Sequence, residues 1–252
     1  MIRIAAVQHD IVWEDPDATM AIVDPLIRSA VEDGARLIVL SEMWATGFSM
    51  NTDQTAQEPD GSIPSFMHDV ARHAGVWIAG SFAERTVGFA RPTNRFVLAG
   101  PDGEDHRYSK VRPFTYGGES EHYDAGSTVH TFTVDGVRVT PLICYDLRFA
   151  DLFWDKAADT DCFVVPANWP ATRRQHWTTL LRARAIENQA YVVGVNRIGA
   201  GGGLDYAGDT RIIDPMGKMI TAPSRETAVI FGEIDPQQVE DVRSQFPFMR
   251  DR

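Results

Sequence analysis

Strand-like runs alternate with helix-like patterns along most of the chain, and this alternation limits the possible fold more than any other feature. The runs 3–8, 36–42 and 76–82 are short and apolar, as buried strands are. The segments 17–35 and 64–75 between them have helical periodicity. Strands that alternate with helices are typical of α/β proteins, in which helices cover a sheet. We therefore expect an α/β fold.

The middle of the chain departs from this pattern. Residues 94–143 contain successive β-type runs, and Asp135-Gly136 has the composition of a hairpin turn, which joins antiparallel strands. After 143 helices and strands alternate again, so we expect mixed sheets flanked by helices. No linker or internal repeat divides the chain, and we expect one domain over residues 1–252. The glycine cluster at 199–208 lacks the GxGxxG spacing of a dinucleotide site, and we interpret it as a flexible surface loop.

Charge and composition exclude several classes of partner. The chain has 24 basic and 35 acidic residues, and its net charge of −11 opposes contact with nucleic acid and anionic lipid. No apolar run approaches the roughly 18 residues that a membrane-spanning helix needs. The opening residues have no basic segment followed by an apolar one, so we expect no signal peptide. These features predict a soluble protein without nucleic-acid or membrane partners.

The chain has only two cysteines, Cys144 and Cys162. Their spacing suggests neither a disulfide framework nor a zinc site, and a reducing, cytoplasmic setting fits best. We interpret Cys162 as a small buried hydrophobic residue. His68 and His73 lie at the wrong helical spacing to share a metal, and we expect neither a metal nor an organic cofactor.

Three strand-like runs end on reactive side chains: Glu42, Lys110 and Cys144. Taken singly, each has an ordinary explanation, since a lone Cys is usually buried and inert and a lone Glu or Lys is usually solvated. Strand ends in layered α/β folds meet in a shared crevice, however, so the coincidence of three is informative. Together they supply a base, a cation for an oxyanion and a nucleophile, which amide hydrolysis requires. A Ser-His-Asp arrangement has less support because the chain has no GxSxG turn.

Six segments then carry a family resemblance: "LSEMWATGF", "YSKVRPF", "GGESEHYDAG", "ICYDLRFADL", "ANWP" and "LLRARAIENQAYVVGVNRIG". Together they resemble the nitrilase superfamily of carbon-nitrogen hydrolases, in order and from the first strand to the last. The resemblance implies that Glu42 is the general base, Lys110 the oxyanion lysine and Cys144 the nucleophile. It also implies that Glu119 is the family's second glutamate, and that the fold is a four-layer αββα sandwich of two stacked sheets.

Within that superfamily the chain most resembles the omega-amidase group, which releases ammonia from the terminal amide of 2-oxo acids such as 2-oxoglutaramate and 2-oxosuccinamate. The resemblance leaves open an N-carbamoyl amino acid, deaminated glutathione or a nitrile as substrate. A catalytically inactive binding or scaffold protein is the alternative of another class. One departure bears on the pocket, because Arg112 and Pro113 stand where many relatives have His and Leu.

The implied mechanism begins when Glu42 takes the proton of Cys144 and the thiolate attacks the amide carbon. Lys110 and the backbone N–H of Tyr145 hold the oxyanion. Ammonia leaves with a proton from Glu42, and water activated by the same carboxylate hydrolyses the thioester.

Several residues next to the motifs are candidates for substrate binding. Arg148 can grip a substrate carboxylate bidentately, and Arg173 and Arg174 are rivals for that role. The alternative for Arg148 is an ion pair with Asp146 or Asp151. We expect the apolar middle of the pocket to be lined by Trp44, Phe48 and Trp169.

The resemblance also implies a homodimer or higher homo-oligomer. The segment 148–158 offers an apolar face with Phe149, Leu152 and Phe153 that could lie on a two-fold axis. Packing within one chain explains the same residues equally well.

Overall fold

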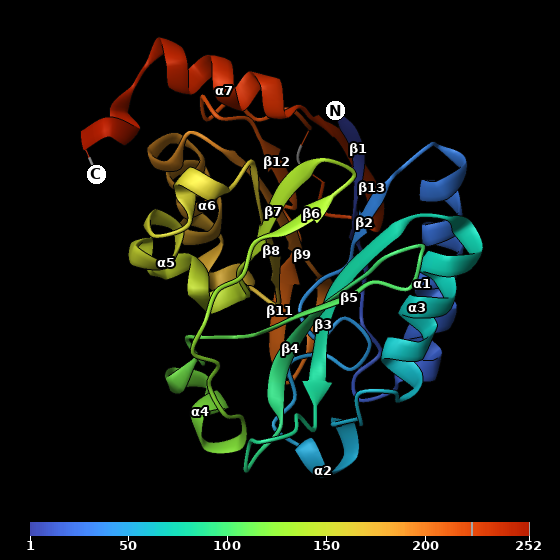
Figure 1. Ribbon diagram of the computed structural model, residues 1–252. Helices are drawn as coiled ribbons and strands as arrows, with labels where there is room; N and C mark the ends of the chain where they lie inside the picture. The colour runs from blue at the N-terminus through green and yellow to red at the C-terminus, as the bar shows by residue number, and fades with distance from the viewer. Residues whose placement is uncertain (223, 252) are drawn as a thin grey trace.

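Two β-sheets occupy the centre of the computed structural model, which describes residues 1–222 and 224–251 (Figure 1). The first sheet has the strand order β13 (Ala228–Ile234), β1 (Ile2–Gln8), β2 (Leu37–Val39), β3 (Trp77–Glu84), β4 (Thr93–Ala99) and β5 (Asp105–Ser109). The second has the order β12 (Arg211–Ile213), β9 (Tyr191–Asn196), β8 (Cys162–Ala167), β7 (Val137–Pro141) and β6 (Phe132–Val134). Strands β1 to β3 and β7 to β9 are parallel, and the outer strands pair antiparallel. Both sheets are therefore mixed, which confirms the prediction.

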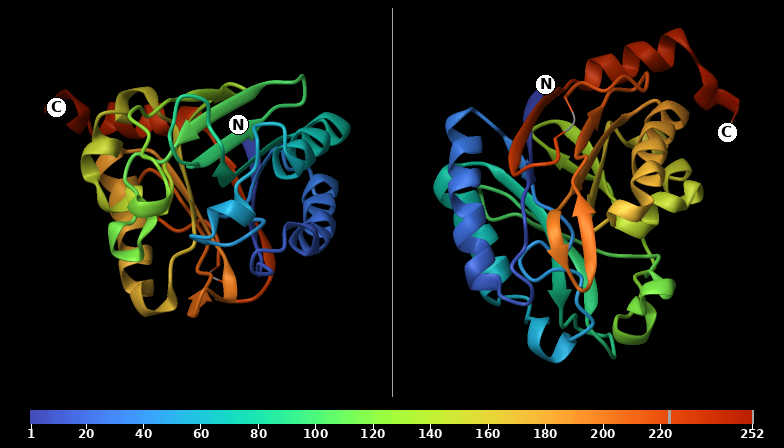
Figure 2. Two further views of the ribbon diagram at one scale, coloured as in Figure 1. Left: turned by 90° about the horizontal axis from the view of Figure 1, so that it is seen from below. Right: turned by 180° about the vertical axis from the view of Figure 1, so that it is seen from behind.

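Helices cover the outer face of each sheet (Figure 2). On the first sheet lie α1 (Pro16–Glu32) and α3 (Ser62–Ala74), and on the second lie α5 (Ala150–Trp154) and α6 (Arg174–Asn188). The remaining helices are α2 (Thr52–Thr55), α4 (Glu119–His122), α7 (Pro236–Gln245) and the 3-10 helices η1 (Thr115–Gly117), η2 (Cys144–Arg148), η3 (Ala157–Asp159), η4 (Ala171–Arg173) and η5 (Phe248–Asp251). The order of layers is thus αββα, as expected. None of the helices in residues 1–222 and 224–251 is long and apolar enough to span a membrane.

The alternation of side chains along β1 explains the stacking. Ile4 and Ala6 belong to the core between the two sheets, whereas Ala5 and Val7 face the helices. A strand that is buried on both faces needs apolar residues at every position, and the segment "IAAV" provides them. The first sheet is therefore an inner layer.

Helix α1 begins where the sequence provides a cap. The carboxylate of Asp15 accepts a hydrogen bond from the backbone N–H of Ala18, and Pro16 occupies the first turn, where no N–H partner is needed. Its buried face carries Val23 and Ile27, which pack on the first sheet. Local capping and helical periodicity thus agree on where this helix starts and which face it buries.

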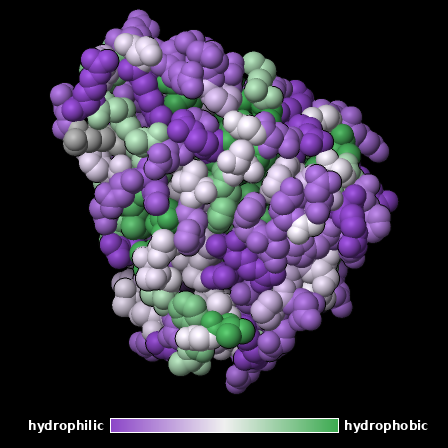
Figure 3. All heavy atoms as spheres, in the orientation of Figure 1, coloured by the Kyte–Doolittle hydropathy of each residue, from purple (hydrophilic) through white to green (hydrophobic). Residues whose placement is uncertain are grey.

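The structure corrects the expectation for one surface segment and favours one of the two explanations left open for another. The glycine cluster is not a loop but a β-hairpin of β10 (Ile198–Gly201) and β11 (Leu204–Ala207). The apolar face of 148–158 turns inward, since Phe153 and Leu152 belong to the chain's own core and α5 spans only five residues. On the face drawn in Figure 3, apolar atoms form small groups separated by hydrophilic ones.

Candidate active site

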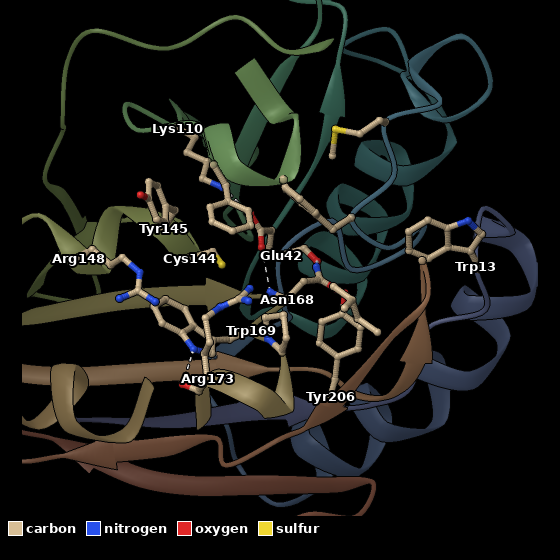
Figure 4. Close-up of a pocket in the computed structure, with 17 residues that line it drawn as sticks. Trp13, Glu42, Lys110, Cys144, Tyr145, Arg148, Asn168, Trp169, Arg173 and Tyr206 are labelled. Carbon is tan, nitrogen blue, oxygen red and sulfur yellow. Dashed lines mark hydrogen bonds and ion pairs between the residues drawn. The ribbon is translucent and has the colours of Figure 1, made fainter. Parts of the chain in front are cut away.

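The three reactive strand-end residues meet between the two sheets (Figure 4). Glu42 follows β2 and Lys110 follows β5, both in the first sheet, while Cys144 begins η2 after β7 of the second. All three line one pocket with a volume of about 260 Å³. The stacking of the sheets therefore brings together residues that are far apart in the sequence.

Lys110 lies in a buried ionic cluster. Its Nζ is 2.8 Å from Oε1 of Glu42 and 2.8 Å from Oε2 of Glu119, and all three side chains are almost completely buried. Burial alone would lower the pKa of Lys110, but the carboxylates of Glu119 and Glu42 outweigh it and raise that pKa above its usual value. The lysine is therefore a cation at neutral pH, held at a fixed place.

Both carboxylates of the cluster are held by further donors. Nδ2 of Asn94 donates to Glu42 at 2.8 Å and to Glu119 at 3.0 Å, and the backbone N–H of Asn168 donates to Oε2 of Glu42 at 2.8 Å. The backbone N–H of Phe114 donates to Glu119. Burial raises the pKa of Glu119, and the charge of Lys110 opposes that rise. The orientation of each carboxylate is thus determined by the protein.

Cys144 is the first residue of η2. Its backbone has a positive φ of 43°, a conformation that residues other than glycine rarely adopt. Its side chain is half-buried and lines the pocket. Burial, together with the negative charge of Glu42 and a hydrogen bond to it, raises the pKa of the thiol well above its ordinary value, and Lys110 opposes this. The resting group is therefore a thiol whose proton lies next to a carboxylate.

Asp146 fixes the turn that carries Cys144. Its Oδ2 accepts hydrogen bonds from the hydroxyl of Tyr108 at 2.7 Å and from the backbone N–H of Ile143 at 2.8 Å, and its Oδ1 accepts from the backbone N–H of Arg112 at 2.9 Å. Burial raises the pKa of this carboxyl to about 6. The contacts tie the cysteine turn to the segment that bears Lys110.

Most of the predicted substrate-binding residues line the pocket: Phe48, Tyr145, Arg148, Trp169 and Arg173. Trp44 does not. Its side chain is fully buried against the helices of the first sheet, with Phe66 at a ring distance of 5.6 Å. Trp44 is close to Glu42 in the sequence, but its side chain lies in the core between the first sheet and its helices.

The two pocket arginines have different surroundings. The guanidinium of Arg148 lies 4.7 Å from the ring of Trp169, and its Nη2 donates to Nδ1 of His176 at 3.2 Å. The guanidinium of Arg173 lies 5.5 Å from the ring of Phe114. Within residues 1–222 and 224–251, no carboxylate lies within ion-pair distance of either arginine. Both cations are therefore available to an anionic ligand.

The structure supports neither an ion pair of Arg148 with Asp146 or Asp151 nor a role for Arg174 in the pocket. The carboxylate of Asp146 is occupied by the donors described above, and that of Asp151 pairs with Arg112 at 3.1 Å, so neither holds Arg148. Arg174 pairs with Asp209 and does not line the pocket.

Arg112 and Pro113, where the chain departs from many relatives, lie outside the pocket that contains Cys144. Arg112 lies over the ring of Phe149 at 5.3 Å and pairs with Asp151 of α5. Neither Arg112 nor Pro113 is among the residues that line the pocket beside Cys144. The departure therefore lies on the outside of the cysteine turn.

Sequence reasoning missed several residues of the site. Asn94 and Asn168 are single amides without a motif, although "ANWP" does contain the second. Trp13, Leu204 and Tyr206 line the pocket from the N-terminal segment and from β11. The glycine cluster was the only signal for the hairpin, and it fits a loop equally well.

The described part of the chain, residues 1–222 and 224–251, has no cluster of three or more His, Cys, Asp or Glu that could hold a metal ion. Its own side chains offer a thiol, a carboxylate beside that thiol, and a buried ammonium. This set can attack a carbonyl carbon, move the thiol proton and stabilise negative charge on the carbonyl oxygen.

Comparison with known proteins agrees with this chemistry. The family described as carbon-nitrogen hydrolase matches residues 3–244. Omega-amidase YafV of Escherichia coli (strain K12) is 38% identical over 253 residues, covering 99% of this chain and 96% of that protein. The 2-oxoglutaramate amidase of Bacillus subtilis (strain 168) is 34% identical over 254 residues, covering 98% and 96%.

A solved structure gives the same result for the fold. It is a CN-hydrolase superfamily protein from Xanthomonas campestris, described with an arsenic adduct in its active site. It is 34% identical and superimposes with a TM-score of 0.94, covering 100% of this chain and 97% of that one. The chain belongs to the carbon-nitrogen hydrolase family.

Proposed function

We propose that the protein hydrolyses the terminal amide of small 2-oxo acids, with 2-oxoglutaramate and 2-oxosuccinamate as substrates. The observation that carries this proposal is the buried Glu42–Lys110–Glu119 cluster beside the Cys144 thiol, in a pocket with two arginines that have no carboxylate partner among the described residues. The names of the relatives from Escherichia coli and Bacillus subtilis support the same activity.

In the proposed reaction, Glu42 takes the thiol proton as the sulfur of Cys144 attacks the amide carbon. The negative charge that develops on the oxygen faces Lys110 and the backbone N–H of Tyr145. The C–N bond breaks as Glu42 returns the proton to the nitrogen, and ammonia leaves. Water, deprotonated by Glu42, then hydrolyses the thioester to give the acid and the thiol.

Glu119 has a positioning role in this proposal. It shares the ammonium of Lys110 with Glu42, and its negative charge helps keep that ammonium protonated. An ammonium that is held between two carboxylates does not reorient when the oxyanion forms, so its stabilising effect costs no rearrangement.

In this proposal the two arginines bind the carboxylate end of the substrate. Arg148 lies beside Tyr145, and Arg173 reaches the same pocket from η4. A guanidinium can bind a carboxylate with two parallel hydrogen bonds, and stacking on Trp169 keeps that of Arg148 in place. A substrate with an acid at one end and an amide at the other is thereby fixed over Cys144.

A panel of substrates tests the proposal. Ammonia release is measured from 2-oxoglutaramate, glutamine, an N-carbamoyl amino acid and an aliphatic nitrile. We expect the highest kcat/KM for 2-oxoglutaramate. A higher value for any other compound would reassign the substrate, and the absence of turnover on all four would favour a binding protein.

Three further properties stay predictions. The single domain over residues 1–252 is supported by a core that runs from Ile2 to Val239. A homodimer or higher homo-oligomer now lacks the apolar face of 148–158 as support, and a sedimentation mass equal to one 28.0 kDa chain at micromolar concentration would refute it. Two free cysteines fit a cytoplasmic location, which fractionation of cells tests.

A further inference from the structure

We propose that the pocket has a second, apolar subsite for the nitrogen side of the substrate, so that the enzyme also hydrolyses N-alkyl amides of 2-oxo acids and releases primary alkylamines. The subsite lies beyond Glu42, on the side of the pocket that Trp13, Leu204 and Tyr206 line. The inference rests on the proposed function, because it uses the same acyl group and the same thiol.

The positions of the labelled residues separate the two ends of the pocket. In Figure 4, Arg148 lies on one side of Cys144 and Trp13 on the opposite side, with Glu42 between Cys144 and Trp13. Tyr206 lies on the same side as Trp13. An acyl chain that extends from Cys144 to Arg148 therefore leaves the side toward Trp13 unused.

The chemistry places the leaving nitrogen on that unused side. Nitrogen departs only when it receives a proton, and the group that holds the proton is Glu42. The nitrogen must therefore face Glu42, and a substituent on it points away from the acyl chain, toward Trp13 and Tyr206. The reaction balances as for a primary amide: water and the N-alkyl amide give the acid and the alkylamine.

The lining of this side suits an alkyl group. The charged residues that line the pocket are Glu42, Lys110, Arg148 and Arg173. The lining toward the hairpin is largely apolar and consists of Trp13, Gly202, Leu204 and Tyr206. An apolar substituent gains free energy there from leaving water, whereas a charged one would lose its hydration without a partner.

This wall is held in place by a buried arginine. The side chain of Arg197 has no exposed surface, and its Nη2 donates to Asp10 at 2.7 Å and to the carbonyl of Ala200 at 3.0 Å. Its guanidinium lies 4.5 Å from the ring of Tyr206. These contacts fasten both strands of the hairpin to the segment that precedes Trp13.

Glycine allows the hairpin to pack this closely. A Cβ at Gly199 would lie 2.2 Å from the carboxylate of Asp10, and one at Gly202 would lie 2.7 Å from the Trp13 ring. Both glycines also have positive φ angles of 79° and 57°. The subsite is therefore preformed. Ligand binding is favoured because the residues of the subsite lose little conformational entropy when the ligand binds.

The first experiment compares 2-oxoglutaramate with its N-butyl and N-carboxymethyl derivatives, with 2-oxoglutarate as the common product. We expect kcat/KM for the N-butyl compound within tenfold of that for the primary amide, and at least 100-fold lower for the N-carboxymethyl compound. An N-butyl value more than tenfold below the primary amide would overturn the subsite while leaving the proposed function intact.

A binding measurement decides the matter without turnover. The Cys144→Ala variant should bind the N-butyl compound about tenfold more tightly than 2-oxoglutaramate, as judged by calorimetry. Equal or weaker binding would overturn the inference. If 2-oxoglutaramate neither binds nor turns over, the proposed function itself fails.

A paired substitution locates the subsite. Leu204→Trp places a bulky ring at the apolar wall and should lower the ratio of N-butyl to primary kcat/KM at least tenfold. Ile220→Trp is the control, since Ile220 is 42% exposed, close to the 43% of Leu204, and does not line the pocket. Both kcat/KM values of a ratio are measured on the same variant, so a smaller fraction of folded protein lowers both equally and does not change the ratio. An unchanged ratio in Leu204→Trp would show that the substituent binds elsewhere.

Discussion

Replacing Glu119 by glutamine removes one of the two negative charges that hold Lys110 while keeping the size of the side chain. The carboxylate of Glu119 accepts from Lys110 at 2.8 and 3.1 Å, from Asn94 at 3.0 Å and from the backbone N–H of Phe114. Glutamine has one acceptor oxygen, so its amide N–H₂ must face at least one of these donors. The variant therefore loses a charge and leaves a buried donor without a partner.

The magnitude follows from both losses. A buried donor without an acceptor costs about 1–3 kcal/mol, and removing one partner of a buried ion pair costs about 3–5 kcal/mol. The second figure is an upper limit here, because Lys110 keeps Glu42 at 2.8 Å. A loss of about 3 kcal/mol in the transition state lowers kcat/KM about 100-fold.

Ammonia release from 2-oxoglutaramate across the pH range is the assay. Glu121→Gln is the control, because Glu121 lies in the same helix and is exposed, and its rate should stay within about twofold of the parent.

Alkylation of Cys144 by iodoacetamide gives a second signal, of opposite sign. The charge of Glu119 contributes to the raised pKa of the thiol, so Glu119→Gln should lower that pKa and speed alkylation at a fixed pH. Turnover equal to the parent's at every pH would mean that Glu119 has only a structural role.

Three other predictions follow from the same geometry. Cys144→Ala should abolish turnover and leave the fold intact, whereas Cys162→Ala should keep most activity; appreciable turnover by purified Cys144→Ala would refute the nucleophile assignment. Arg148→Lys keeps the charge but loses the two-point contact, so kcat/KM for 2-oxoglutaramate should fall about tenfold while a neutral amide of similar length is spared; equal losses on both would mean that Arg148 supports the site's structure. Burial raises the pKa of Asp146 to about 6 from its ordinary 3.8, so the folded state binds this proton more tightly than the unfolded state does. The contribution of Asp146 to the free energy of unfolding should therefore fall by about 3 kcal/mol as pH rises from roughly 4 to 6. Urea titrations at several pH values should show this fall in the parent and not in Asp146→Asn. The same dependence of the free energy of unfolding on pH in both proteins would contradict the raised pKa of Asp146.

The strand ends were predictable from the sequence because the signals there are local. Apolar runs that stop at Glu42, Lys110 and Cys144 mark where strands leave the core, and layered sheets bring such ends together. The αββα order came from the family resemblance, since alternation of strands and helices does not determine how many sheets form.

The rest of the site depends on tertiary packing. Trp44 is two residues from Glu42, but proximity in the sequence does not tell which side of a strand end a side chain takes. The glycine cluster is a hairpin because Asp10 and Arg197 fasten it, and these partners lie far apart in the chain. The ion pair between Arg112 and Asp151, which leaves Arg148 available, has no sequence signal either.

In the proposed reaction Cys144 forms a thioester with the acyl group of the substrate. The most direct test is a rapid acid quench of the enzyme during turnover of 2-oxoglutaramate, followed by mass spectrometry of the intact chain and its peptides. We expect one added 2-oxoglutaryl group, on the peptide that contains Cys144. An adduct on Cys162, or turnover without any covalent adduct at the shortest times, would contradict it.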